Sequence, residues 1–128
     1  MIKYEVGDFT FELDLAKPLY EQVLDQIKHA IARGEVELGT KIPSVRELAQ
    51  QLKINPNTVM RAYQELEREK LSETRRGQGT FITSSEEKVM EIKKNLAKDA
   101  IEAFIGSMKV LGIDRETAKN LLEEVEWQ

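Results

Sequence analysis

The sequence predicts a mainly helical protein with a small β-hairpin, arranged as a winged helix-turn-helix domain over residues 1–83 and a helical hairpin over residues 84–128. Three observations support this fold class. Apolar residues recur at helical spacing in five segments, two of these segments are separated by only three residues, and a glycine-containing turn then joins two short strand-like runs. A length of 128 residues is enough for one domain or two small ones.

The N-terminal part is predicted to hold an extended segment and a first helix. Residues 9–14 alternate apolar and polar side chains, as expected of a short strand or an extended arm. From Pro18 the period becomes helical, which predicts a helix over about residues 18–33. Pro18 suits its first turn, and Gly34 suits the left-handed position after its end.

The next two segments predict a helix-turn-helix. A helix over about residues 45–52 begins with Ser44 and Glu47 at capping-box spacing. A second helix is predicted from Asn55, a favourable N-cap residue, to about Lys70. Because only three residues lie between the two helices, they form the compact motif rather than two independent elements.

A β-hairpin is predicted over residues 72–83, directly after this motif. Its turn contains Arg76, Gly77 and Gly79, and glycines supply the positive φ angles that a tight hairpin turn requires. Three helices followed by such a hairpin make a winged helix.

The C-terminal region is predicted to be two amphipathic helices. A long helix over about residues 86–111 ends at Gly112, and Asp114 caps a last helix. Two helices alone bury too little apolar surface to be stable, so their apolar side needs a partner, and the simplest partner is a second copy of the chain. The predicted dimerisation residues are Leu96, Ala100, Phe104, Met108, Leu111, Leu121, Leu122 and Val125.

Charge is distributed unevenly along the chain. The net charge is −4, but residues 41–85 hold 8 basic and 5 acidic side chains, whereas residues 1–40 hold 4 and 8 and residues 86–128 hold 7 and 10. Because salt limits the reach of a surface charge to about 8–10 Å, a local basic excess can bind phosphate on an acidic protein.

The outward face of the helix that follows Asn55 has the chemistry of base recognition. Asn57, Arg61, Gln64 and Arg68 lie opposite its apolar stripe, with Thr58 at the edge. Amides pair with adenine and guanidinium groups with guanine in the major groove, so Asn57, Thr58 and Arg61 are predicted DNA contacts. Ordinary solvation of first-turn polar residues is the alternative for Asn57 and Thr58.

Two more groups are predicted to contact the DNA backbone or the minor groove. Arg75 and Arg76 lie at the tip of the hairpin, where cations beside glycine can approach the minor groove. Alternatively, they only prevent edge-to-edge pairing of strands. The other group lies at the start of the helix over 45–52 and consists of Lys41, Ser44 and Arg46.

Four runs of the sequence, in order over residues 10–83, resemble the GntR family of bacterial transcription regulators. They are PLYEQ from Pro18, IPSVRELA from Ile42, INPNTVMRAYQELE from Ile54 and RGQGTF from Arg76. The resemblance implies sequence-specific binding to double-stranded operator DNA. It also implies which residues contact that DNA, namely Arg46, Asn55, Asn57, Thr58 and Gly77.

The short tail resembles the YtrA subfamily, whose two-helix C-terminal region serves dimerisation. The resemblance therefore implies a homodimer, and we expect a repressor that binds an inverted repeat. Two positions depart from the family pattern. Leu38 replaces a common proline, which affects the expected orientation of the wing, and Lys70 replaces a common glycine. Lys70 must then adopt a left-handed conformation at an energetic cost, or the helix ends differently.

Other classes of function are not supported by the residues. His29 is the only histidine and lies on the polar side of its helix, and cysteine is absent. Gly77 and Gly79 do not form a nucleotide-binding loop. We therefore expect no catalytic residue, metal site or cofactor. No apolar run has the length of a signal-peptide core or a membrane span, so we expect a cytoplasmic protein without a membrane partner. The residues leave open whether a small-molecule effector binds.

A winged helix used as a protein-interaction adaptor, without specific DNA binding, is the alternative function. In that case the acidic tail would bind another regulator through its apolar stripe instead of a second copy.

Overall fold

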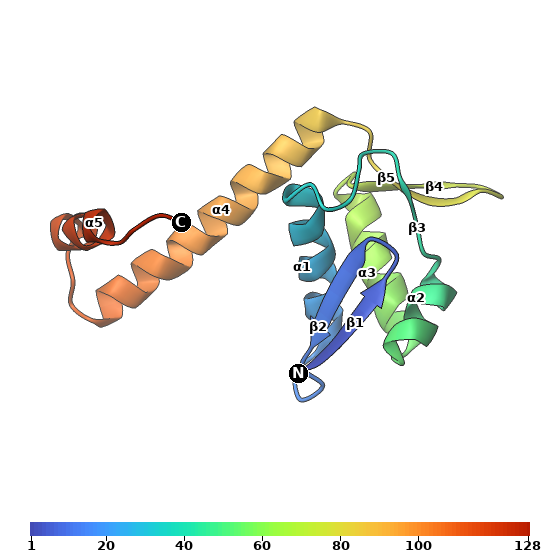
Figure 1. Ribbon diagram of the computed structural model, residues 1–128, viewed down its shortest axis with the longest axis horizontal. Coiled ribbons are helices and arrows are strands. Elements are labelled where there is room, and N and C mark those ends of the chain that lie inside the picture. Colours follow the sequence, from blue (N-terminus) through green and yellow to red (C-terminus); the bar gives the residue numbers. More distant parts are fainter. The chain divides into compact units, whose positions relative to one another are not determined.

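The computed structural model describes residues 1–128 and divides them into two compact units, Met1–Lys93 and Lys94–Gln128. Figure 1 shows the elements in chain order: β1 (Ile2–Val6), β2 (Phe9–Leu13), α1 (Leu19–Ala32), β3 (Lys41–Ile42), α2 (Val45–Leu52), α3 (Pro56–Arg68), β4 (Ser72–Arg75), β5 (Gly79–Ile82), α4 (Glu86–Val110) and α5 (Arg115–Glu124). The fold class expected from the sequence is confirmed. The assignment of DNA binding to residues 1–83 and dimerisation to residues 84–128 stays a prediction.

The chain begins with a β-hairpin, of which the sequence pattern had predicted only the second strand. β1 pairs with β2 in antiparallel fashion, with Val6 opposite Phe9. Gly7 begins the two-residue turn between them with φ +60°, a position where tight hairpins favour glycine. The alternating side chains of β2 are buried, with Phe9 and Phe11 at 5.7 Å between ring centroids. The hairpin therefore closes one side of the first unit's core.

Two glutamines of α1 hold the outer edge of β2. The Gln26 amide accepts from the backbone N–H of Glu12 and donates to its carbonyl oxygen, at 2.8 and 2.7 Å. One turn earlier, the Gln22 amide makes the same pair of bonds with Asp14, at 2.8 and 3.0 Å. These side chains replace the hydrogen bonds that a further strand would supply, so the edge is protected.

The wing contains one strand more than predicted. β4 and β5 form the expected hairpin, and β3 adds to the other side of β5, with Lys41 opposite Phe81. The sheet order is β3-β5-β4, so β5 is central. Ile42 and Ile82 are buried beneath it.

Four helices end with the same left-handed turn. The residues after α1, α2, α3 and α4 have φ between +58° and +77°. Two of them are the predicted glycines, Gly34 and Gly112, and two are lysines, Lys53 and Lys70. Each turn has the paired Schellman hydrogen bonds; after α3 these run from the N–H of Lys70 to Glu67 and from the N–H of Leu71 to Leu66. Of the two alternatives for Lys70, the structure has the left-handed cap, and the left-handed cap at Lys53 was not predicted.

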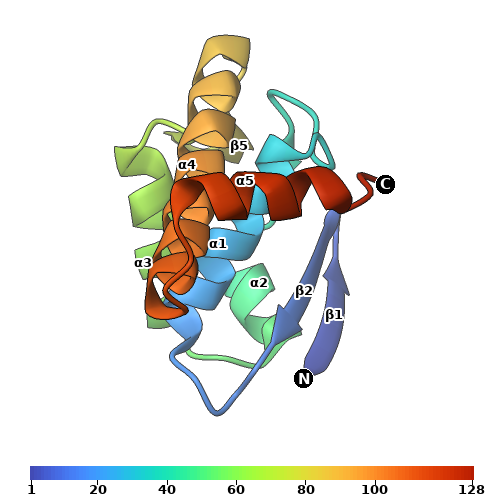
Figure 2. The ribbon, with the colours of Figure 1, turned by 90° about the vertical axis from the view of Figure 1, so that its left-hand side faces the viewer.

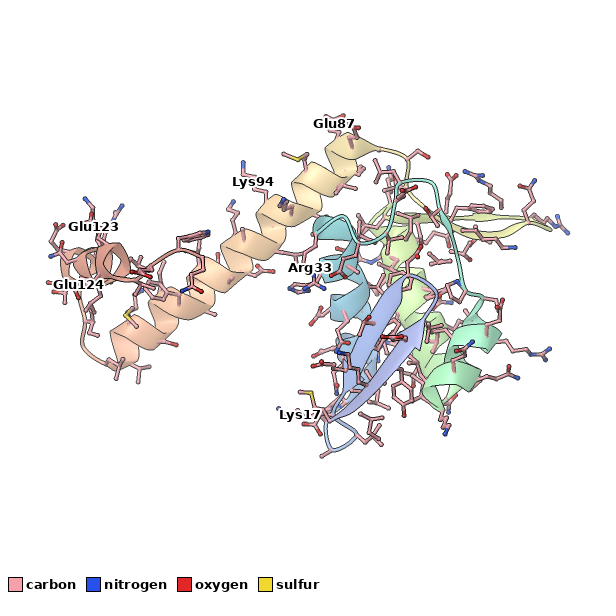
Figure 3. All side chains as sticks on the ribbon, viewed as in Figure 1. Lys17, Arg33, Glu87, Lys94, Glu123 and Glu124 are labelled. Atoms are coloured by element: carbon pink, nitrogen blue, oxygen red, sulfur yellow. The ribbon has the colours of Figure 1, made fainter.

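The second unit consists of the rest of α4 and α5, which crosses α4 (Figure 2). Asp114 caps α5 as predicted, accepting from the N–H of Thr117 at 2.9 Å, and this bond holds the pKa of Asp114 below its usual range. Ala118 is the only buried side chain of α5. Glu123 and Glu124 project into solvent (Figure 3). None of the chain's helices combines the length and apolar composition that a membrane crossing needs.

Candidate nucleic-acid interface

The helix-turn-helix is formed by α2 and α3, and both start at the residues predicted from the sequence. Ser44 and Glu47 form the full capping box at the start of α2: the Ser44 hydroxyl accepts from the Glu47 N–H at 3.1 Å, and the Glu47 carboxylate accepts from the Ser44 N–H at 3.3 Å. At the start of α3, Asn55 Oδ1 accepts from the N–H of Asn57 at 2.8 Å. Ser44 and Asn55, both predicted DNA contacts, therefore also cap their helices.

A hydrogen bond fixes α3 to the segment that enters α2. The hydroxyl of Tyr63, on the buried side of α3, donates to the carbonyl of Pro43 at 2.6 Å. Burial first, and the charge of Glu47 second, raise the pKa of Tyr63 above its usual value, so the hydroxyl keeps its proton. The wing and α2 both lie on the side of α3 away from α1 (Figure 1).

On the exposed face of α3, the edge nearer α1 carries Arg61, which contacts Tyr20 of α1. The guanidinium carbon of Arg61 lies 4.0 Å from the ring centroid of Tyr20, in the first turn of α1. This is a cation–π contact, and Arg61 has no carboxylate partner in the chain. At the other end of the same helix pair, Lys28 binds Glu69 at 2.9 Å. The guanidinium of Arg61 is therefore stacked against α1, and its role as a DNA contact stays a prediction.

The second arginine of this face is also engaged. Arg68 makes three hydrogen bonds to the carboxylate of Glu65, between 2.6 and 3.1 Å. These bonds lower the pKa of Glu65 and raise the pKa of Arg68, as expected of an ion pair. The guanidinium of Arg68 is consequently directed along the helix.

The centre of the face carries two amides, and the side nearer the wing carries a thioether. Asn57 and Gln64 are exposed, and no hydrogen bond within the chain engages their side chains. Met60 is 43% exposed. Two turns after Met60, Glu67 accepts a 3.3 Å hydrogen bond from the N–H of Thr74 in β4, which places this edge of the helix toward the wing. Thr58 is half-buried at the opposite edge.

The two arginines of the wing differ in their surroundings. Arg75 donates to Glu73 at 2.7 and 3.0 Å, and its guanidinium carbon lies 4.1 Å from the ring centroid of Phe81. Arg76 is exposed and has no ion-pair partner. Gly77 follows it with φ +78°. Of the two predicted wing-tip cations, Arg75 has partners within the wing and Arg76 has none. That both contact DNA stays a prediction.

Two further cations precede α3 in the chain. The side chain of Lys41 lies across β5, because a Cβ atom built on Gly79 would come within 2.7 Å of Lys41 Cε. Arg46 is exposed in the first turn of α2 and forms no ion pair. Both are free to bind phosphate oxygens.

Sequence reasoning omitted two residues that matter for this surface, Tyr20 and Met60. Tyr20 lies in a separate helix, so only the fold shows that it holds Arg61. Met60 lies in the same helix as Asn57 and Gln64. It is three residues after the first and four before the second, and this spacing places it beside both on the helix surface.

No group of three or more histidine or acidic side chains in the chain has an arrangement that could hold a metal ion. His29 is exposed, and its Nδ1 donates to the carbonyl of Asp25 at 2.6 Å, within its own helix. It has no second titratable partner that would suggest acid–base chemistry.

Comparison with known proteins gives a consistent family. The model of the family described as bacterial regulatory proteins, gntR family, matches residues 19–82. The HTH-type transcriptional regulator YhcF of Bacillus subtilis is 50% identical over 101 residues, which cover 79% of this chain and 84% of YhcF. The HTH-type transcriptional repressor YtrA of the same organism is 38% identical over 109 residues, which cover 84% of each chain.

Solved structures agree with these relatives. A GntR family transcriptional regulator from Listeria monocytogenes has a TM-score of 0.80 and 38% identity, over 89% of this chain and 100% of that one. The DNA-binding domain of AraR in complex with operator ORE1 has a TM-score of 0.50 and 32% identity, over 62% of this chain and 99% of that one.

Proposed function

The chain belongs to the GntR family of bacterial regulatory proteins, and we propose that this DNA-binding transcriptional regulator is a homodimeric repressor that binds an inverted-repeat operator. Its relatives are regulators rather than enzymes. The repressor role is supported by the name of the YtrA relative. Operator binding is supported by the AraR domain, whose structure contains its operator.

In the proposed complex, α3 enters the major groove and the wing follows the minor groove. The single observation that carries this proposal is the pair of exposed, unengaged amides of Asn57 and Gln64, on a helix whose start is capped and whose buried side is tied to Pro43. Rigidly held amides recognise base edges at short range. The cations that would bind phosphates or the minor groove are Lys41, Arg46, Arg61 and Arg76.

The apolar surface of the second unit supports the homodimer. The predicted residues Leu96, Phe104 and Met108 are half-buried in α4, whereas Ala100, Leu111, Leu121, Leu122 and Val125 are exposed. Ile101 and Ile105 add to this surface, with exposed fractions of 55% and 43%. An apolar helical surface of this extent is typical of an interface, and a second copy would bury the same surface on both chains.

Selection of bound duplexes from a randomised DNA library, together with sedimentation of the free protein, tests this function. We expect a dimer at micromolar concentration and an enriched inverted repeat whose half-sites are separated by about one helical turn or a little more. Affinity should fall steeply as salt rises. A monomer that enriches no sequence and shows no salt-dependent DNA binding would instead support the protein-interaction adaptor.

A further inference from the structure

The exposed face of α3 consists of three parallel strips. Arg61 and Glu65 lie toward α1, Asn57 and Gln64 occupy the centre, and Met60 lies toward the wing. The arginines that would be expected to select guanine have other partners, because Arg61 is stacked on Tyr20 and Arg68 is bonded to Glu65. The side chains left for the bases carry no charge.

We infer that α3 recognises adenine–thymine base pairs, with the amides of Asn57 and Gln64 pairing with adenine and the thioether chain of Met60 contacting the C5-methyl group of a thymine. This inference rests on the proposed function and adds the class of base pair to it. It follows from chemistry: amides match the donor and acceptor of adenine in the major groove, and only thymine presents a methyl group there.

Met60 is the residue whose exposure this inference explains. Met60 is a large apolar side chain that is 43% exposed and lies beside two amides on a recognition helix. An unbranched thioether adapts its shape to a small apolar group such as a methyl. A cytosine or a purine at the same position would leave the side chain against a polar edge, which is a penalty rather than a contact.

Removing a single methyl group from the DNA tests the inference directly. A duplex selected by the full-length protein from a randomised library is synthesised again with deoxyuridine in place of each thymine in turn, which deletes only the C5-methyl group. In each half-site we expect one thymine whose replacement alone weakens binding by about fourfold. This is the loss that corresponds to one buried methyl group. The Met60→Ala variant should bind the deoxyuridine and thymine duplexes equally.

Two control variants make the result specific. Met90→Ala removes another exposed methionine, 66% exposed in α4, and should keep the full sensitivity to deoxyuridine. Selection repeated with Arg61→Ala should return the same adenine–thymine pairs at lower overall affinity, because Arg61 is not assigned to a base.

Three results would overturn the inference. The first is a selected duplex in which no thymine methyl affects binding, the second is full methyl sensitivity in Met60→Ala, and the third is loss of a guanine preference in Arg61→Ala. Each of these leaves sequence-specific DNA binding intact, so the proposed function would survive. A protein that enriches no duplex at all would overturn both.

Discussion

The hydroxyl of Tyr63 and the backbone carbonyl of Pro43 are joined by a 2.6 Å hydrogen bond. This bond connects the buried side of α3 to the residue that precedes the cap of α2, so it joins the two helices of the DNA-binding motif across 20 positions of the chain. The bond holds the helix that carries the exposed amides, although neither partner lies on the exposed face.

Tyr63→Phe should lower the free energy of unfolding by roughly 1–2 kcal/mol, since it leaves a carbonyl in the protein without its donor. Urea denaturation measures the change, which should appear in the midpoint and not in the slope. Tyr4→Phe is a matched control, because the half-buried Tyr4 hydroxyl has no hydrogen bond within the chain. Equal stabilities for the two variants would mean that the bond adds nothing.

Arg76→Ala should weaken DNA binding and reduce the dependence of log affinity on log salt by about 1, because the free wing-tip cation releases one counterion on binding. Arg75→Ala is its control. The guanidinium of Arg75 is already held by Glu73 and Phe81, so this variant should leave the salt slope nearly unchanged. Anisotropy titrations at several salt concentrations distinguish the two, and a larger slope change for Arg75→Ala would contradict the assignment.

Ile105→Asp should dissociate the dimer, because it places an unpaired charge in the proposed apolar interface. Ile105 is exposed within the chain, so the change should leave the protomer folded. Phe104 is half-buried, and Phe104→Asp should have the same effect. Sedimentation gives the oligomeric state, with Asn95→Asp, an equal charge change outside the apolar surface of α4, as the control. If Ile105→Asp and Phe104→Asp both remained dimeric, the interface would have to lie elsewhere.

Lys70→Gly should raise the free energy of unfolding by up to about 1 kcal/mol. A non-glycine residue in the left-handed region costs roughly 1–2 kcal/mol, and the added freedom of glycine in the unfolded chain offsets part of this gain. Thermal unfolding measures the change. Lys109→Gly is the opposite control, because a glycine within the last turn of α4 should destabilise the protein. A destabilised Lys70→Gly variant would mean that the lysine side chain makes a stabilising contact.

Much of the fold was predictable because local chemistry determines it. The caps Ser44, Asn55 and Asp114 and the glycine after α1 all have the roles expected from sequence, since capping depends on residues within a few positions. β3 was not predictable, because it has only two residues and exists through pairing with a strand about 40 positions away. The left-handed Lys53 carried no glycine signal.

The residue types of the candidate site were predictable from the sequence, but the contacts that its arginines make within the chain were not. The polar face of α3 follows from helical periodicity. Which arginines remain free depends on contacts between elements: Tyr20 in α1 holds Arg61, and Phe81 in β5 holds Arg75. Such contacts require the tertiary structure, because no pattern within one helix or strand encodes them.

The most direct test of the central claim measures how Asn57→Ala discriminates among single-base variants of the selected operator. The parent should prefer its operator over a duplex changed at one particular base pair in each half-site by about 1–3 kcal/mol, and Asn57→Ala should lose this preference at those two symmetric pairs alone. If parent and variant instead rank all duplexes in the same order and by the same ratios, the amide face of α3 does not recognise bases.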